Sequence, residues 1–372
     1  MSERVRTELF SFDPAAPLER ARTIPNTWYT DPEIYELERQ SVFGGNWFMA
    51  GRLDQVAAPG SFLTAEIAGE PILVVRDAEG TLRAFFNVCR HRAAPILTEP
   101  CGSVSKLRCR YHGWTYDLAG RLRGTPEFEG VAEFHKEEQG LPEVPVATWG
   151  PLVWVHLGEP AQTLEQFLEP LPAWVAGRGG IGKLQFVRRQ EYDLSCNWKV
   201  YVDNYLDGGY HVNTVHPGLA GVLDYREYTT AVHGFTSLQS SPIKAADADD
   251  QTKRTRTGDL AAYWWIYPNF MVNLYEGVMD TNLVLPLGPD RCRVVFDFHF
   301  AEPTGTERER FMRESMAVAH RIQEEDMGIC EEVQRGLTSR SYRCGRFSVK
   351  REVAGYYFHQ LLGRQLQAAI GP

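Results

Sequence analysis

The chain has 372 residues, which is enough for two structural units, and its hydrophobic content of 43% is typical of a globular protein with a buried core. Its formal charge of −9, from 39 basic and 48 acidic residues, disfavours nucleic acid as a partner, because nucleic-acid surfaces need clustered Lys and Arg. The charged N-terminal segment lacks the apolar run of a signal peptide and no apolar stretch reaches the ~20 residues of a membrane span, so we expect a cytoplasmic protein without membrane contact.

Residues 72–88 and 114–124 alternate apolar and polar side chains about Glu-Gly and Ala-Gly dipeptides, which predicts short antiparallel strands. Two mixed pairs of soft metal ligands lie in this part of the chain: Cys89 with His91, and Cys109 with His112. Zinc could bind such a set, but zinc sites usually pair Cys with Cys and His with His. In a Rieske 2Fe-2S centre one iron takes both thiolates and the other takes both imidazoles, so each loop supplies one of each. The mixed order therefore favours a Rieske cluster, with zinc as the alternative.

Residues 197–211 are compatible with a helix on which Asn204, Asp207 and His211 step by three and four and share one polar face. Asn204 and Asp207 are therefore candidate catalytic residues beside a candidate metal ligand.

The second histidine, His216, is five residues from His211 and would point elsewhere if the helix continued at ~100° per residue. Pro217 disfavours the α conformation at His216, so we expect the helix to break and both imidazoles to converge. Two histidines leave an oxygen-activating iron short of one ligand, and its usual third partner is a carboxylate. The pattern predicts an Fe(II) site that takes an acid from elsewhere in the chain.

Residues 307–336 supply such an acid. A helical stripe of apolar side chains places Asp326 at a core position, where an unpaired carboxylate would be costly to bury. Four acids fall off the stripe and are interpreted as a solvated face: Glu324, Glu325, Glu331 and Glu332. The alternative is a stripe that tolerates one exposed acid; the need for a third ligand favours Asp326.

The aromatic stretch at 263–275 could form a cage for a quaternary ammonium group, because ring faces attract cations. The candidate substrate residues are Trp264, Trp265 and Tyr267. The alternative is a core strand of a sheet, for which aromatic residues are equally suited.

From about residue 25 to about residue 362 the chain resembles the oxygenase components of Rieske non-haem iron oxygenases, with the runs DNYLDGGYH, YPNFMVNLY and MDTNLVLPLGP most similar to choline monooxygenases and their bacterial relatives. The resemblance implies an α+β fold, in which a mostly antiparallel Rieske domain (43–160) is inserted in a helix-grip catalytic domain (1–42 and 161–372). It also implies a 2Fe-2S cluster and a mononuclear Fe(II). The implied cluster ligands are Cys89, His91, Cys109 and His112, and the implied iron ligands are His211, His216 and Asp326.

The resemblance further implies head-to-tail homotrimers in which one subunit's cluster feeds its neighbour's iron through a bridging carboxylate. The usual bridge lies three residues before the first histidine, which is Gly208 here. Asp207 is the preferred candidate and Asp203 the alternative. The chain lacks the C-x4-C-x2-C spacing of a plant-type ferredoxin, so a separate ferredoxin or NAD(P)H-dependent reductase is expected to supply electrons.

The function expected from these features is hydroxylation or N-demethylation of a quaternary ammonium compound, choline or a betaine, with O2. An aromatic ring-hydroxylating dioxygenase α subunit is the alternative enzyme. A non-enzymatic electron carrier or a zinc protein is the alternative of a different class.

Overall fold

The computed structural model describes residues 1–244 and 251–371, and the chain divides into two compact units. The larger unit combines residues 1–42 with 167–372, and the smaller unit comprises residues 43–166. The units contain both helices and antiparallel sheets, so the prediction of an α+β fold is confirmed. Among the described residues, no helix is long and apolar enough to cross a membrane.

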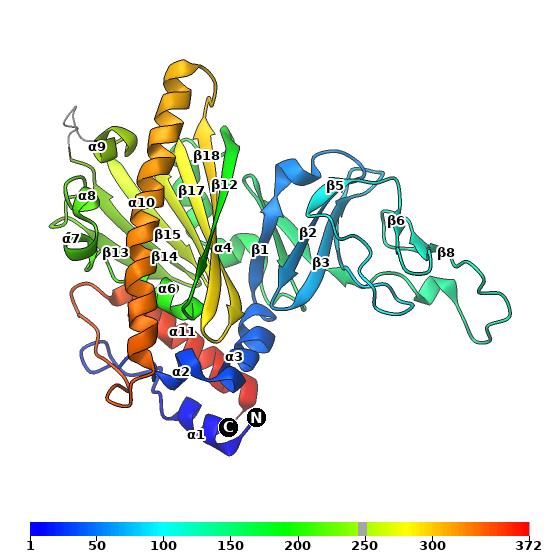
Figure 1. Cartoon of the computed structure of the whole chain (residues 1–372), viewed down its shortest axis with the longest axis horizontal. Coiled ribbons are helices and arrows are strands. Elements are labelled where there is room, and N and C mark those ends of the chain that lie inside the picture. The colour runs from blue at the N-terminus through cyan, green and yellow to red at the C-terminus, as the bar shows by residue number, and fades with distance from the viewer. Residues whose placement is uncertain (245–250, 372) are drawn as a thin grey trace. The chain divides into compact units, whose positions relative to one another are not determined.

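The larger unit is built on a seven-stranded antiparallel sheet (Figure 1). Its strands, in sheet order, are β12 (Leu184–Leu194), β18 (Arg291–Ala301), β17 (Val278–Gly288), β16 (Phe270–Tyr275), β15 (Leu260–Ile266), β14 (Thr236–Pro242) and β13 (Thr229–His233). Cross-strand register pairs Gln239 with Tyr263, Tyr263 with Asn273, and Asn273 with Asp280. Because directly paired residues point to the same face, these four polar side chains form one row across four strands.

Helix α10 (Thr306–Leu337) crosses in front of this sheet in Figure 1, and α6 (Trp198–Tyr205) contacts both α10 and the strands β17 and β18. The predicted helix over 307–336 is therefore confirmed. Its apolar stripe is only partly buried, since Val333 is 44% exposed while the polar Gln323 and Gln334 are buried. Helix α11 (Val353–Ile370) contacts β13. The remaining α-helices are α1 (Glu3–Phe10), α2 (Thr27–Thr30), α3 (Pro32–Glu38), α4 (Leu164–Leu168), α5 (Leu171–Ala176), α7 (Val212–Val215), α8 (Pro217–Ala220) and α9 (Gln251–Thr255).

The prediction of one helix over 197–211 is wrong beyond Tyr205, where α6 ends. Gly208 and Gly209 both adopt φ of +69°, in the left-handed region that interrupts a right-handed helix. Asn204, Asp207 and His211 thus do not share a continuous helical face. Asp207 instead lies in the turn between α6 and α7.

The chain leaves the α conformation again at His216, where φ is −117° and ψ is 75°, as the following proline predicts. His211 and His216 therefore flank α7, a helix of one turn, and this short element sets the distance between their rings.

The smaller unit consists of three antiparallel sheets. The first has the order β5 (Cys101–Ser103), β2 (Ser61–Ile67), β3 (Glu70–Arg76), β4 (Leu82–Phe86) and β9 (Glu143–Val144). The second has the order β1 (Trp47–Arg52), β11 (Leu152–His156) and β10 (Val146–Trp149), and the third β6 (Leu107–Arg108), β7 (Thr115–Tyr116) and β8 (Leu122–Gly124). The predicted hairpins are confirmed, because β3 pairs with β4 and β7 pairs with β8.

Candidate active site

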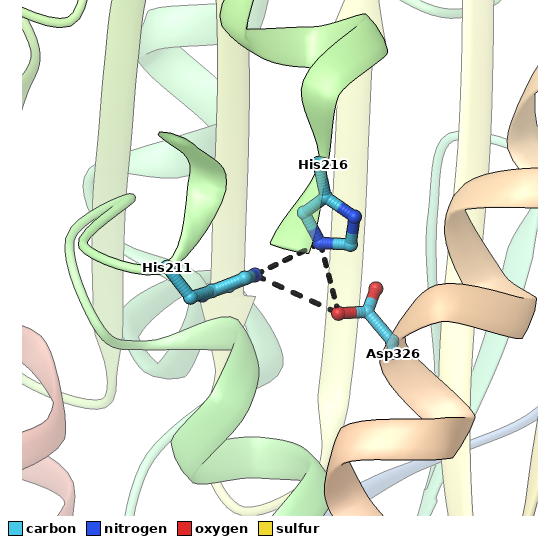
Figure 2. A group of neighbouring side chains, drawn as sticks. All are labelled: His211, His216 and Asp326. Carbon is cyan, nitrogen blue, oxygen red and sulfur yellow. Dashed lines mark hydrogen bonds and ion pairs between the residues drawn. The ribbon is translucent and has the colours of Figure 1, made fainter. Parts of the chain in front are cut away.

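Three side chains converge beside the large sheet (Figure 2): His211 and His216 from either end of α7, and Asp326 from α10. His216 Nε2 lies 2.9 Å from His211 Nε2 and 3.0 Å from Asp326 Oδ1, and His211 Nε2 lies 3.6 Å from that oxygen. Ligand atoms bound at about 2.1 Å from one ion, at right angles to each other, are about 3 Å apart. The three groups therefore fit a single divalent metal, and two imidazoles with one carboxylate are typical of a non-haem Fe(II) site with open positions.

Two carboxylates orient the imidazoles. Asp207 accepts a hydrogen bond from the backbone N–H of His211 at 2.9 Å and contacts its Nδ1. Glu325 contacts the Nδ1 of His216 at 2.6 Å. Because both Nδ1 atoms are engaged, both Nε2 atoms are directed to the point they share with Asp326.

Glu325 is a residue whose contact the sequence did not predict. The apolar stripe places it on the solvated face, but its side chain is 31% exposed and reaches His216. Its position directly before Asp326 is the one signal that could have found it. Asn204 holds the carboxylate of Asp326, since its Nδ2 donates a hydrogen bond to Asp326 Oδ1 at 2.6 Å.

Opposite charges are concentrated at the three converging groups. Burial opposes a charge on His211, but hydrogen bonds to Asp207 and Asp326 outweigh it and raise the pKa of His211 to about 10. Burial alone would raise the pKa of Asp326, but His211 and His216 outweigh it and lower that pKa to about 2. The two imidazoles thus favour the ionised form of Asp326, which is the form that binds a metal ion.

Asp203, the alternative bridge, is engaged elsewhere. Tyr29 donates to its Oδ2 at 2.5 Å, and the Nε2 of His359 lies 2.8 Å from its Oδ1. Of Asp203 and Asp207, it is Asp207 that contacts His211.

In the smaller unit, the two Cys/His pairs lie on two tight turns. The N–H of Ala93 donates to the carbonyl of Cys89 at 3.0 Å, and the N–H of Gly113 donates to the carbonyl of Cys109 at 3.1 Å. Gly113 has a φ of +73°, which the second turn requires and which favours glycine. Both thiols are buried, at 3% exposure each.

The imidazoles of these pairs also lie together, with the ring centroids of His91 and His112 4.7 Å apart. Trp114 stacks on His91, with the ring centroids 4.8 Å apart, so it covers that imidazole. His91 Nδ1 is buried and has no hydrogen-bond partner among the described residues. A buried imidazole nitrogen without a partner fits a metal ligand, and two thiols with two imidazoles fit the donor set of a Rieske cluster.

A cavity adjoins the three converging groups and extends over the sheet face that carries the polar row. His211, His216 and Asp326 line it, and its aromatic lining consists of Tyr201, Tyr205, Tyr228, Tyr263, Tyr275 and Phe296. A cationic substrate would meet several ring faces here. Tyr263 and Tyr275 come from the stretch in which a cage was predicted.

The three aromatic residues predicted to contact substrate are not among the residues that line this cavity. Trp264 points to the opposite face of the sheet and packs against Trp174 of α5, because side chains alternate along a strand. Trp265 packs on Phe358 of α11 at 5.6 Å, and the hydroxyl of Tyr267 donates to Gln365 of α11. All three are core residues, so their assignment to the substrate is corrected.

The combination of a Rieske-type donor set with a two-histidine, one-carboxylate site is typical of oxygenases that pass electrons from an iron–sulfur cluster to a mononuclear iron. The family model for the Rieske [2Fe-2S] domain matches residues 46–135, and the model for the ring hydroxylating alpha subunit (catalytic domain) matches residues 181–368. The chain belongs to the family of ring-hydroxylating oxygenase α subunits.

Individual relatives cover nearly the whole chain. A chloroplastic choline monooxygenase of Arabidopsis thaliana is 41% identical over 96% of this chain and 86% of its own length. The carnitine monooxygenase oxygenase subunit of Escherichia coli (strain K12) is 30% identical over 93% and 94%. The solved structure of a quaternary ammonium Rieske monooxygenase, described for carnitine oxidation and inter-subunit electron transfer, has a TM-score of 0.83 at 26% identity, covering 93% of this chain and 96% of that one.

Membership in this family gives the chain two cofactors, a Rieske 2Fe-2S cluster and a mononuclear iron. The chain is an oxidoreductase that uses O2, and its electrons come from a separate electron-transfer partner.

Proposed function

We propose that this chain is the oxygenase component of a monooxygenase that hydroxylates a C–H bond close to the nitrogen of a quaternary ammonium compound, choline or a betaine. The observation that carries the proposal is the tyrosine-rich cavity at the three converging groups, because tyrosine faces attract a cation that cannot donate hydrogen bonds. The similarity to choline and carnitine monooxygenases supports the same class of substrate.

We assign His211, His216 and Asp326 as iron ligands, and Cys89, His91, Cys109 and His112 as cluster ligands. Iron in such a site supplies reductive activation of O2. Asp207 holds the Nδ1 of His211 and is the proposed link through which electrons reach that ring. Asn204 and Glu325 fix the other two ligands.

Each turnover places one oxygen atom in the C–H bond and releases the other as water, so it consumes two electrons and two protons. When that C–H bond belongs to an N-methyl group, the product is an N-hydroxymethyl group, whose C–N bond then breaks to release formaldehyde, a proton and the tertiary amine. The alcohol carbon of choline would instead become an aldehyde hydrate. The electrons originate at NAD(P)H and arrive through a separate reductase, with or without a ferredoxin.

We further propose a head-to-tail homotrimer in which the cluster of one subunit reduces the iron of the next. Inter-subunit electron transfer in a related monooxygenase supports this arrangement. Beside the proposed link, Tyr210 is 55% exposed and available to a neighbouring subunit.

The proposal is tested by loading the protein with iron and cluster, adding a surrogate reductase, and assaying choline, glycine betaine and carnitine. We expect aldehyde or formaldehyde in step with O2 consumption, and none from the His216→Ala variant.

Formation of a cis-diol from an aromatic substrate, with no turnover of any quaternary ammonium compound, would favour a ring-hydroxylating dioxygenase instead. A colourless protein that contains zinc and no acid-labile sulfide would eliminate both enzymes.

A further inference from the structure

Two buried ionisable side chains of opposite type, Arg256 and Asp280, line the cavity. Arg256 follows α9, Asp280 lies in β17, and both are 5% exposed and line the cavity. Within residues 1–244 and 251–371, no carboxylate lies within ion-pair distance of the Arg256 guanidinium. Burial opposes the charge on Arg256, but Tyr275 and Asp280 outweigh it and raise the pKa of the guanidinium. Burial also raises the pKa of the Asp280 carboxyl, and Arg256 counteracts part of that rise.

The guanidinium of Arg256 is incompletely satisfied. It lies over the ring of Tyr275, 4.7 Å from the centroid, but its Nε has no hydrogen-bond acceptor among the described residues. A buried cation without a hydrogen-bonded anion is costly, and the ring face compensates for part of that cost. An anionic ligand in the cavity would supply the rest.

A chain of hydrogen bonds leaves a second donor free. The hydroxyl of Tyr205 donates to Asn273 Oδ1 at 2.7 Å, and Asn273 Nδ2 donates to Asp280 Oδ2 at 3.1 Å and to Asn282 Oδ1 at 3.0 Å. A carboxylate only accepts, so Asp280 fixes the orientation of the Asn273 amide, and that in turn fixes Asn282. The Nδ2 of Asn282 is left buried without an acceptor in the described part of the chain.

Both free donors belong to residues that line the same cavity as the iron site. A ligand that binds both donors needs a hydrogen-bond acceptor at one end, and the charge of Arg256 favours an acceptor that is negatively charged. Asp280 and the tyrosine rings suit a positive group. The buried charges of the cavity are therefore matched by a ligand that carries both signs.

We propose that the preferred substrate is a zwitterion, a trimethylammonium compound with a carboxylate, whose carboxylate is bound by Arg256 and Asn282 and whose ammonium lies toward Asp280 and the tyrosines. This inference rests on the proposed function and narrows it from quaternary ammonium compounds to betaines. Choline brings a second cation to Arg256 and a neutral hydroxyl in place of the anion, so it leaves the guanidinium unpaired.

Wild-type selectivity is measured first, because it needs no variant to fold. Anaerobic calorimetric titration of the holoenzyme with glycine betaine, carnitine and choline should show at least one of the carboxylated compounds binding roughly 10-fold or more tighter than choline. The same compound should be N-demethylated, with one formaldehyde for each O2 consumed.

The role of Arg256 is tested by Arg256→Gln and Arg256→Lys. Arg256→Gln should lower kcat/KM for the betaine by about 10- to 100-fold, mainly through KM, and should lower kcat/KM for choline by much less. Arg256→Lys should restore part of the loss, because it returns the charge without the planar fork. Arg254→Gln, a substitution of a partly exposed arginine two residues earlier, is the matched control and should behave as wild type.

Two outcomes separate the inference from the function on which it rests. The preference for a zwitterion would be wrong if choline bound as tightly as both carboxylated compounds, or more tightly. It would also be wrong if Arg256→Gln lowered kcat/KM equally for choline and for the betaine. Either result would leave the proposed quaternary ammonium monooxygenase intact. No binding and no turnover of any of the three would overturn the proposed function itself.

Discussion

Asp207 is the residue on which the proposed coupling of cluster and iron depends. It contacts His211 through both the backbone N–H and the ring Nδ1, whereas Asp203 is held by Tyr29 and His359. The Asp207→Asn variant keeps the size of the side chain but removes its charge, so the ring of His211 loses its charged hydrogen-bond acceptor. We expect turnover to fall by about 10- to 100-fold with the cluster intact.

The measurement is a single turnover, in which the prereduced cluster is mixed with O2 and substrate and its visible absorbance is followed. Asp203→Asn is the matched control and should reoxidise at nearly the wild-type rate. If Asp203→Asn blocked reoxidation of the cluster and Asp207→Asn did not, Asp203 and not Asp207 would be the bridge.

Gly208 sets the turn that brings Asp207 to His211. A Cβ atom there would lie 2.0 Å from the backbone carbonyl oxygen of Arg351, and φ is already +69°. We expect Gly208→Ala to displace the turn and lower iron occupancy, measured by metal analysis, with full retention of cluster absorbance. Gly234 is the control: it also has a positive φ, of +51°, but the methyl group added by Gly234→Ala would meet open space. This substitution should cost about 1–2 kcal/mol of stability without loss of iron.

At the scale of elements, a buried ion pair joins α3 to α6, the helix that leads into the iron site. Lys199 Nζ lies 2.7 Å from Glu38 Oε1, both side chains are 0% exposed, and Trp198 Nε1 donates to Glu38 Oε2 at 2.9 Å. Glu38→Gln would leave the ammonium buried without its counter-ion. We expect the free energy of unfolding to fall by about 3–5 kcal/mol, measured by urea titration.

Glu36→Gln on the same helix is the control. Glu36 pairs with Arg39 but its side chain is 47% exposed, so the change should stay within about 0.5 kcal/mol. The double variant Glu38→Leu, Lys199→Met removes both charges and should recover most of the loss. Equal effects of Glu38→Gln and Glu36→Gln would contradict a structural role for the buried pair.

The elements also show what the sequence could predict. The helix over 307–336 and the hairpins of the smaller unit follow from local patterns, because each has its period and its turn residues within a short window. The helix predicted over 197–211 extends too far, because no local pattern shows that Gly208 and Gly209 adopt left-handed conformations. Local pattern also gave His211, His216 and Asp326, whose types and spacing are unusual.

The substrate cavity could not be predicted in the same way. Gln239, Tyr263, Asn273 and Asp280 meet in one row only through the register of four strands, and no local pattern records that register. The aromatic stretch was identified, but alternation assigns Tyr263 to the cavity and Trp264 to the opposite face. No local sequence pattern predicts that Arg256 is buried, because its burial depends on the packing of distant parts of the chain.

At the scale of the whole molecule, the proposed homotrimer predicts complementation between two inactive chains. Cys89→Ala removes a cluster ligand and keeps the iron site, and His216→Ala removes an iron ligand and keeps the cluster. Each variant alone should be inactive. If the cluster of one subunit serves the iron of the next, co-expression creates working pairs wherever an iron-competent chain adjoins a cluster-competent one.

With equal amounts and random assembly, an iron site is competent with probability one half and its donor cluster with probability one half, so about a quarter of wild-type activity per chain is expected. The assay is formaldehyde or aldehyde release by the copurified mixture, with each chain carrying a different affinity tag. Variants purified separately and mixed briefly are the control and should stay inactive. Zero activity in a verified mixed oligomer would mean that electrons pass within one chain, because each variant then lacks one half of its own path.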